Sequence, residues 1–352
     1  MPPFWDRPVG LAELSRLRKN LPVRGHVKRS LSKDLELLVT LWPSFPHFAN
    51  FSQDERLAGI RLNSAMMSVS ELGKELELVK SIDRPVPLFF DVKGHQLRVE
   101  TIEETPEGMV LGLNHRIEVK TPLVVLFKAG EDRALLTRVE DDGRRLVFDG
   151  WPEYNMKTGE SLHLRHPSLV VHEPFFTEAE LTKIAQVRKF GFKRYFISFV
   201  ESEKYVDAFL ELVGKDSEVW LKIESEKGLE YVATKFKKRP NLRLVAACGD
   251  MYVEIDQPHN IMVALKLVLE KDKEACVGSR MLLSIVRGPV PELADFLQLA
   301  WLYEIGYRSM MLCDELCLRG DLLSTAVNVF DAFRQTYTKP VREYEMTLAE
   351  DA

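Results

Sequence analysis

The sequence has few cysteines and no long apolar run. Its four cysteines lie at positions 248, 276, 313 and 317 of 352, and none shows paired C-x-x-C spacing. This excludes a disulfide framework, so we expect a reducing, cytoplasmic environment. The apolar runs are strand-sized, such as Leu123–Phe127, whereas a membrane-spanning helix needs roughly 18 apolar residues. We therefore expect no membrane association.

A strong charge imbalance is also missing. Lys and Arg number 48 against 53 Asp and Glu, which gives a formal net charge of −5. Proteins dedicated to nucleic acids are usually basic, so we expect no nucleic-acid partner. Basic residues dominate within residues 1–34, where the stretch from Arg16 to Lys33 holds seven Lys or Arg and no acid. We interpret residues 1–34 as a solvated basic arm without a signal-peptide core.

The sequence instead shows strand-like apolar runs that alternate with segments of helical periodicity. At roughly 150 residues per domain, the length fits about two domains. Strand-length apolar runs occur before residue 97 and return after Pro174, with amphipathic segments between them. Thr177 and Glu180 form a capping-box pattern that predicts a helix to Phe190. The eight predicted strands span residues 35–41, 59–63, 86–91, 195–200, 218–223, 242–247, 274–279 and 309–313.

Eight βα units predict an α/β fold, a closed (β/α)8 TIM barrel. Residues 97–168 interrupt this order with short β-like runs and turns, which predicts a small all-β domain inserted after the third strand. The barrel is then expected to comprise residues 35–96 and 169–338, followed by a tail at 339–352. An open doubly wound sheet is the alternative, but no Gly-rich dinucleotide fingerprint follows the first strand.

Polar residues stand at the ends of six predicted strands. In a barrel these ends converge on one face, where active sites lie. Carboxylates, cations and a hydroxyl gathered there suit a hard divalent metal and an anionic substrate. Residues 222 and 224 alternate along one strand and therefore point to the same side. The strand ends carry Arg61 and Asn63, Asp91 and Lys93, Lys222 and Glu224, Gly249 and Asp250, Ser279 and Arg280, and Asp314 and Glu315.

From about residue 35 to residue 333, these strand ends resemble the pyruvate kinase family. Six motifs in the family's order carry the resemblance, around a β insertion in the corresponding loop. They are R-L-N at 61–63, 91–98 against D-T-K-G-P-E-I-R, K-I-E at 222–224, 249–255 against G-D-L-G-V-E-I, 279–282 against T-Q-M-L, and 311–315 against M-L-S-G-E. The resemblance implies Mg²⁺-dependent phosphoryl transfer between phosphoenolpyruvate and ADP, giving pyruvate and ATP.

The resemblance also implies roles for residues around the transferred phosphate. Glu224 and Asp250 would hold Mg²⁺ or Mn²⁺. Lys222 would stabilise charge on the transferring phosphoryl group, and Arg61 would bind the substrate phosphate. Ser279 takes the place of a threonine at the proton-transfer face of the enol and keeps its hydroxyl.

Further implied positions surround these groups. The backbone at Gly249 and Asp250 would bind the substrate carboxylate, as helix N-termini do. Arg98 would face the nucleotide from the hinge of the inserted domain. Asn63 and Asp91 would belong to a monovalent-cation site for K⁺.

Several positions depart from the family pattern. Val92 and Ala65 stand where the family supplies two oxygen ligands to K⁺, so the K⁺ site is incomplete, unless a one-residue deletion puts Ser64 in the place of the family's serine. Tyr252 replaces a glycine where substrate approaches. The inserted domain is short and the family's C-terminal regulatory domain has no counterpart. We therefore expect a homo-oligomer, and a dimer rather than a tetramer.

These departures leave two alternatives open. The first is a metal-dependent enzyme that acts on a pyruvate enolate, of the aldolase or lyase type, which Tyr252 and the altered K⁺ site favour. The second is a non-catalytic, pyruvate kinase-like binding protein. The joint retention of Lys222, Glu224 and Asp250 argues against this second alternative.

Histidines and cysteines outside these motifs predict no separate site. His163 and His166 lie three residues apart with His172 nearby, but no H-E-x-x-H pattern is present. We interpret these histidines as solvent-exposed residues of the inserted domain. Cys313 and Cys317, near the predicted site, are expected to be buried thiols.

Overall fold

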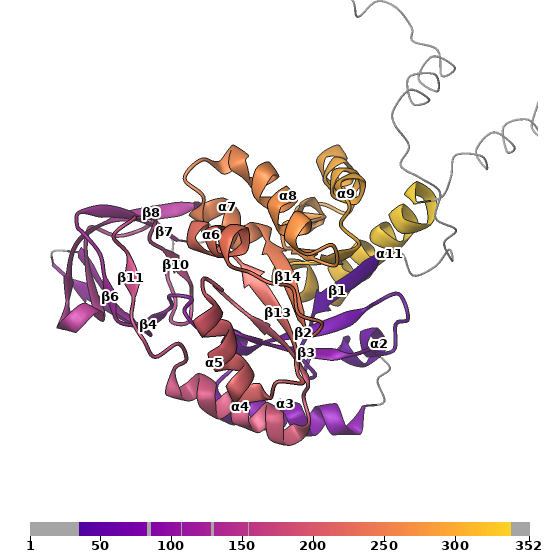
Figure 1. The fold of residues 1–352 in the computed structure, drawn as a ribbon, viewed down its shortest axis with the longest axis horizontal. Helices are drawn as coiled ribbons and strands as arrows, with labels where there is room; N and C mark the ends of the chain where they lie inside the picture. Colours follow the sequence, from indigo (N-terminus) through magenta and orange to yellow (C-terminus); the bar gives the residue numbers. More distant parts are fainter. Residues whose placement is uncertain (1–34, 83–85, 107, 128–129, 154, 339–352) are drawn as a thin grey trace, which may run out of the picture. The chain divides into compact units, whose positions relative to one another are not determined.

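The computed structural model describes residues 35–82, 86–106, 108–127, 130–153 and 155–338 (Figure 1). The predicted basic arm and C-terminal tail lie outside the described residues. Eight parallel strands close a barrel in the order β1-β16-β15-β14-β13-β12-β3-β2, which confirms the predicted fold class. They are β1 (Glu36–Thr40), β2 (Gly59–Asn63), β3 (Leu88–Val92), β12 (Arg194–Ile197), β13 (Glu218–Ile223), β14 (Leu242–Ala247), β15 (Cys276–Gly278) and β16 (Ser309–Met311).

Helices follow the strands and cover the barrel. The capping box at Thr177 and Glu180 begins a helix, as the sequence predicts, and Gly191 ends it with a left-handed φ of 101°. The helices are α2 (Phe48–Ser52), α3 (Val69–Ser81), α4 (Glu178–Phe190), α5 (Glu203–Val213), α6 (Glu226–Thr234), α7 (Cys248–Glu254), α8 (Ile261–Lys271), α9 (Leu293–Ile305), α10 (Asp314–Cys317) and α11 (Gly320–Tyr337).

The strand β15 is shorter than predicted. The sequence pattern extends to Ser279, but the strand ends at Gly278. Ser279 and Arg280 have φ angles of 62° and 60°, in the left-handed region that a β-strand cannot use. The chain therefore turns one residue early, where the strand reaches the C-terminal end of the barrel.

An aromatic cluster fills part of the barrel interior. Phe89, Phe196 and Trp220 are buried from three neighbouring strands, with ring centroids 4.9 to 5.2 Å apart. The Arg243 guanidinium lies 4.2 Å from the Trp220 ring centroid. Rings and cation together make the interior a packed core rather than a pore.

Two small antiparallel sheets lie in sequence between β3 and α4. The larger has the strand order β10-β7-β8-β9-β5-β4 and the smaller pairs β11 with β6. These sheets have a hydrophobic core of their own, and the domain boundaries stay a prediction. The strands are β4 (Val99–Thr105), β5 (Gly108–Leu113), β6 (Ile117–Glu118), β7 (Leu123–Phe127), β8 (Asp132–Glu140), β9 (Arg145–Asp149), β10 (Leu162–His163) and β11 (Val170–Val171).

None of the helices in the described part of the chain combines the length and the apolar composition needed to cross a membrane.

An aromatic cluster also marks the point where β3 leads into the inserted sheets. The His95 ring stacks on Tyr205 at 5.7 Å and lies 4.9 Å from Phe175. Burial lowers the pKa of His95 to about 4, from an ordinary value of 6.5. The native state therefore binds fewer protons than the unfolded state between these two pH values.

This difference predicts an acid-dependent loss of stability that His95→Phe should remove. As pH falls from 6.5 to 4, wild type should lose up to about 3 kcal/mol of unfolding free energy relative to the variant. Urea denaturation at several pH values measures this difference. His259→Phe, at an exposed histidine, serves as the control and should follow the wild-type curve. A constant difference between wild type and His95→Phe would contradict the prediction.

Candidate active site

A cavity of about 330 Å³ opens at the C-terminal ends of the barrel strands. Every predicted site residue except Asp91 lines it, and Asp91 lies beneath with no exposed surface. Charged and polar groups from strands distant in sequence therefore meet here. The lining includes Arg61, Asn63, Lys93, Gln96, Arg98, Lys222, Glu224, Gly249, Asp250, Ser279, Arg280, Asp314 and Glu315.

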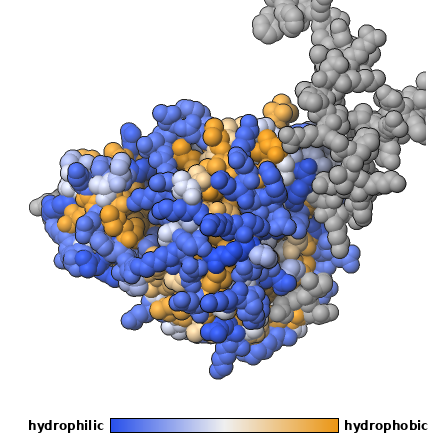
Figure 2. Space-filling model, in the orientation of Figure 1, coloured by the Kyte–Doolittle hydropathy of each residue, from blue (hydrophilic) through white to orange (hydrophobic). Residues whose placement is uncertain are grey.

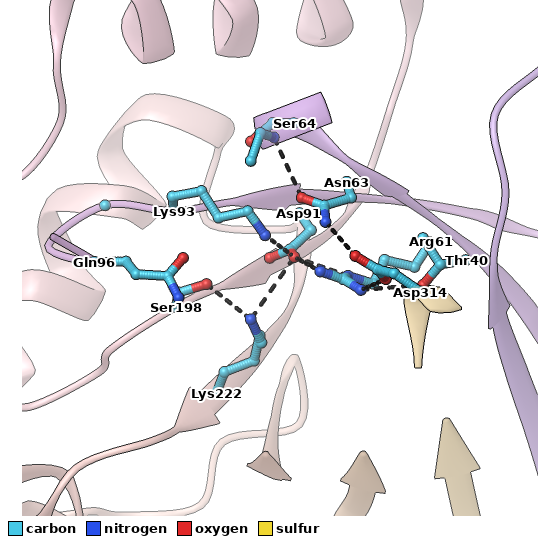
Figure 3. Close-up of polar contacts among 12 residues, drawn as sticks. Thr40, Arg61, Asn63, Ser64, Asp91, Lys93, Gln96, Ser198, Lys222 and Asp314 are labelled. Atoms are coloured by element: carbon cyan, nitrogen blue, oxygen red, sulfur yellow. Dashed lines mark hydrogen bonds and ion pairs between the residues drawn. The ribbon is translucent and has the colours of Figure 1, made fainter. Parts of the chain in front are cut away.

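Asp91 is the centre of a buried cluster of cations (Figure 3). Its Oδ2 accepts hydrogen bonds from Arg61 Nη2 at 2.6 Å and from Lys93 Nζ at 2.6 Å, and Lys222 Nζ lies 3.7 Å away. Burial by itself would raise the pKa of Asp91, but the three cations outweigh burial and hold it well below its usual range. Burial and the neighbouring Lys222 and Arg61 in turn lower the pKa of Lys93 to about 7.

Lys222, on β13, and Glu224, the residue that follows this strand, form a buried ion pair. Lys222 Nζ lies 2.9 Å from Glu224 Oε1 and donates a hydrogen bond to Ser198 Oγ at 2.9 Å. The backbone N–H of Phe199 donates to Glu224 Oε2 at 2.7 Å. Burial raises the pKa of Glu224 to about 7; Asp250 adds to this rise, while Lys222 opposes it. The two side chains therefore point to the same side, as their alternation in sequence predicts.

Asp250 lies at the start of α7, between the barrel and the inserted sheet. Its side chain is 26% exposed, whereas that of Glu224 is 0% exposed. Gln96 Nε2 lies 3.4 Å from Asp250 Oδ2, and His163 Nε2 lies 3.7 Å from Asp250 Oδ1. Asp250 is therefore the more accessible of the two carboxylates in the cavity.

His163 corrects the expectation of exposed histidines. Its side chain is 1% exposed, and its Nδ1 lies 2.6 Å from Glu254 Oε1 on α7. The flanking Leu162 and Leu164 belong to the core of the inserted sheet, and the carboxylates of Asp250 and Glu254 on α7 lie beside the ring nitrogens. Burial lowers the pKa of His163, but the carboxylates of Glu254 and Asp250 outweigh it and the net direction is upward. The signal available in the sequence was that His163 stands between two apolar residues. The three-residue spacing of His163 and His166 did not indicate that His163 is buried.

Arg61 and Asn63 both donate hydrogen bonds to the Asp314 carboxylate. Arg61 Nη1 donates to Asp314 Oδ1 at 2.7 Å and to Thr40 Oγ1 at 3.0 Å. Asn63 Nδ2 donates to Asp314 Oδ2 at 2.7 Å, and Asn63 Oδ1 accepts from the Ala65 N–H at 3.2 Å. A strand-end pattern places Asp314 near the site, but only the fold reveals that it orients both side chains.

Ser279 and Gly249 bring the ends of β15 and β14 together. The Gly249 N–H donates to Ser279 Oγ at 2.7 Å. A Cβ on residue 249 would lie 2.7 Å from this oxygen, so a glycine is needed for the close approach. A substrate carboxylate at this backbone would compete with Ser279 for the same N–H.

Tyr252 does not line the cavity. It is 44% exposed, and the Arg280 guanidinium lies 5.5 Å from its ring centroid. The short helix α7 turns this side chain outward, which corrects the expectation that it obstructs the substrate.

Arg98 does line the cavity, and its Nη2 donates to Gln96 Oε1 at 2.6 Å. Cys313 and Cys317 are buried thiols, as predicted.

The carboxylates of Glu224 and Asp250 fit a divalent cation. Glu224 Oε1 is buried with the Lys222 ammonium 2.9 Å away as its ion-pair partner, and burial and the neighbouring Asp250 carboxylate raise the pKa of Glu224. A cation between two adjacent carboxylates relieves their repulsion. Among residues 35–338, where described, no group of three His, Cys, Asp or Glu side chains forms a metal site. Substrate and water oxygens would therefore complete the coordination.

The residues predicted for K⁺ fit a cation poorly. Asn63 uses both amide atoms within the protein, and Asp91 Oδ2 is shared by protein cations. Asp91 Oδ1 has no hydrogen-bond partner, but Arg61, Lys93 and Lys222 crowd the surrounding space with positive charge. A hard cation needs several oxygen ligands. Asn63 and Asp91 together offer one, the Oδ1 atom of Asp91.

The fold and this cavity define a (β/α)8 barrel with an acid–lysine cluster at the face where barrel enzymes bind their substrates. In sequence, the chain is 23% identical over 288 residues to a pyruvate kinase from Thermoplasma acidophilum. The match covers 74% of this chain and 50% of that protein, so the chain spans about half the length of the curated relative it matches. No family model matches the chain. The predicted resemblance to pyruvate kinase is confirmed as a distant one.

Proposed function

We propose that the protein is a phosphotransferase of the pyruvate kinase type, which transfers the phosphoryl group of phosphoenolpyruvate to ADP. The observation that carries the proposal is the ion pair of Lys222 and Glu224 at 2.9 Å, beside Asp250 in the cavity. Two carboxylates that bind a divalent cation, next to a lysine that stabilises negative charge, suit an anionic substrate. The distant similarity to a pyruvate kinase supports the same reaction.

The proposed roles follow from where each side chain lies. Glu224 and Asp250 hold Mg²⁺ or Mn²⁺, which when bound neutralises charge on the phosphate and enolate oxygens. The Lys222 ammonium, kept charged by Asp91 and Glu224, stabilises negative charge on the transferring group. Arg61 binds the substrate phosphate from an orientation that Asp91 and Asp314 maintain.

The second half of the reaction needs a proton. When the phosphoryl group leaves for ADP, the remaining enolate carbon takes up one proton to become pyruvate. We assign its delivery to the Ser279 hydroxyl, which accepts a hydrogen bond from the Gly249 N–H and regains its proton from solvent water, so that the water supplies the proton overall. Arg98 faces the nucleotide phosphates from the hinge of the inserted sheet.

A coupled assay tests the proposal. Phosphoenolpyruvate, ADP and Mg²⁺ should give pyruvate with the purified chain, and omission of Mg²⁺ should stop the reaction. Lack of pyruvate formation, together with Mn²⁺-dependent binding of oxalate, would favour the enolate lyase. Failure to bind any divalent cation would favour the non-catalytic alternative. The argument for the lyase from Tyr252 no longer holds, because this side chain faces away from the cavity.

The assay should give similar rates in KCl and in tetramethylammonium chloride. Arg61, Lys93 and Lys222 already surround Asp91, so an added monovalent cation meets positive charge and one oxygen without a partner. Equal ionic strength in the two salts is the control. A rise of tenfold or more in KCl would contradict this prediction.

A further inference from the structure

Two further cavities lie between the inserted sheets and the barrel. They have volumes of about 190 and 390 Å³ and share five lining residues, so they adjoin each other. None of the residues that line the active-site cavity lines either of them. The space around the shared residues is called here the Glu201 site. The shared residues are His95, Val171, Phe199, Glu201 and Lys227.

The walls of the Glu201 site are largely apolar and aromatic. Leu162 and Leu164 line it from the inserted sheets, and Tyr205 and Tyr231 from α5 and α6; all four are buried. On the face drawn in Figure 2, hydrophobic residues of the inserted sheets form only small groups among hydrophilic ones. The apolar side chains therefore surround an enclosed space, which suits a small molecule.

The carboxylate of Glu201 has no cation as its direct partner. Its Oε1 accepts a hydrogen bond from Ser225 Oγ at 2.5 Å, and Glu201 forms no ion pair with any described residue. Lys227 instead donates to the Leu169 carbonyl oxygen at 2.6 Å. Burial raises the pKa of Glu201, while the hydrogen bond from Ser225 and the charge of Lys227 oppose this rise. A cation that enters the site would therefore stabilise the charged form of Glu201.

The rest of the lining also favours a cation. Acidic residues outnumber Lys and Arg by four to two in the smaller cavity. Aromatic rings attract ammonium groups to their faces. The Lys204 ammonium already lies 5.7 Å from the ring centroid of Phe175, which lines the larger cavity. An anion in the smaller cavity would be repelled. The charged residues of the smaller cavity are Glu201, Glu226, Glu254, Asp256, Arg165 and Lys227.

We propose that the Glu201 site binds a small organic ammonium ion. The ammonium group pairs with the Glu201 carboxylate, and the apolar body of the ligand packs against the leucines and aromatic rings of the walls. The site lies outside the active-site cavity, and the proposal does not depend on the proposed reaction.

Isothermal titration calorimetry of the full chain with 2-phenylethylammonium chloride tests the proposal without any substrate. We expect a dissociation constant of about 1 mM or lower. 2-Phenylethanol and phenylacetate carry a hydroxyl and a carboxylate in place of the ammonium group, and should bind at least roughly tenfold more weakly. This comparison uses wild type only and needs no variant to fold.

Glu201→Gln should weaken the binding of 2-phenylethylammonium at least about tenfold, because the amide keeps the shape of the carboxylate and loses its charge. Glu211→Gln, at an exposed position of α5, is the matched control and should bind as wild type does. Asp250→Asn changes the acidic active-site cavity and should also leave the affinity for 2-phenylethylammonium unchanged.

Three results would overturn the proposal. One is the lack of detectable 2-phenylethylammonium binding to wild type below about 10 mM. Another is equal affinity for the three compounds, or equal affinity of wild type and folded Glu201→Gln for the ammonium ion. The third is weaker binding to Asp250→Asn but not to Glu201→Gln, which would place the cation in the active-site cavity. Because no reaction is measured, failure of the proposed activity leaves this test unaffected.

Discussion

Lys222→Met should lower kcat by about three orders of magnitude and leave the fold intact. Lys222 is buried between Asp91 and Glu224, and its charge is available to a phosphoryl group in the cavity. Removal of one fixed donor to developing charge costs about 10²–10³ in kcat, and more for a charge in phosphoryl transfer. The fold should tolerate the change because Asp91 keeps Arg61 and Lys93 as partners.

The coupled assay gives kcat, and thermal unfolding of the same preparation reports the fold. Lys227→Met is a suitable control, because this lysine donates to the Leu169 carbonyl oxygen outside the cavity. Near-normal turnover by a folded Lys222→Met variant would show that Lys222 has no role in the reaction.

Glu224→Gln should weaken Mn²⁺ binding about 100-fold and stabilise the metal-free protein. A divalent ion loses one of two anionic ligands, and affinity depends strongly on ligand charge. Without metal, the substitution removes the repulsion between Glu224 and Asp250 and the cost of a buried carboxylate. Stability and metal affinity therefore change in opposite directions, which separates this effect from general damage to the fold.

Electron paramagnetic resonance of added Mn²⁺ measures the dissociation constant directly. Glu315→Gln is the matched control, since Glu315 lines the same cavity from an exposed position. Equal Mn²⁺ affinity of wild type and Glu224→Gln would remove Glu224 from the metal site.

Local patterns were sufficient to predict the barrel and the residues of its C-terminal face. Alternation along one strand put Lys222 and Glu224 on the same side, and the capping box at Thr177 and Glu180 located the start of α4. These signals depend on neighbours within about four residues, which a single sequence displays.

Contacts between distant parts of the chain were not predictable in this way. The burial of His163 requires α7, 91 residues away in sequence at Glu254. The outward direction of Tyr252 depends on where α7 begins and on the position of Arg280. No local pattern contains either fact, because the first arises when the inserted sheet packs against α7 and the second when α7 packs beside the end of β15.

The sequence by itself determined the order of strands and helices, the closed barrel and the set of polar side chains at its mouth. These properties follow from periodicity and from the geometry of parallel strands. Only the tertiary structure decided which charges pair: Arg61 with Asp91 and with Asp314, the latter 253 residues away. Such pairing depends on distances of a few ångströms after folding, and a sequence specifies side chains without specifying those distances.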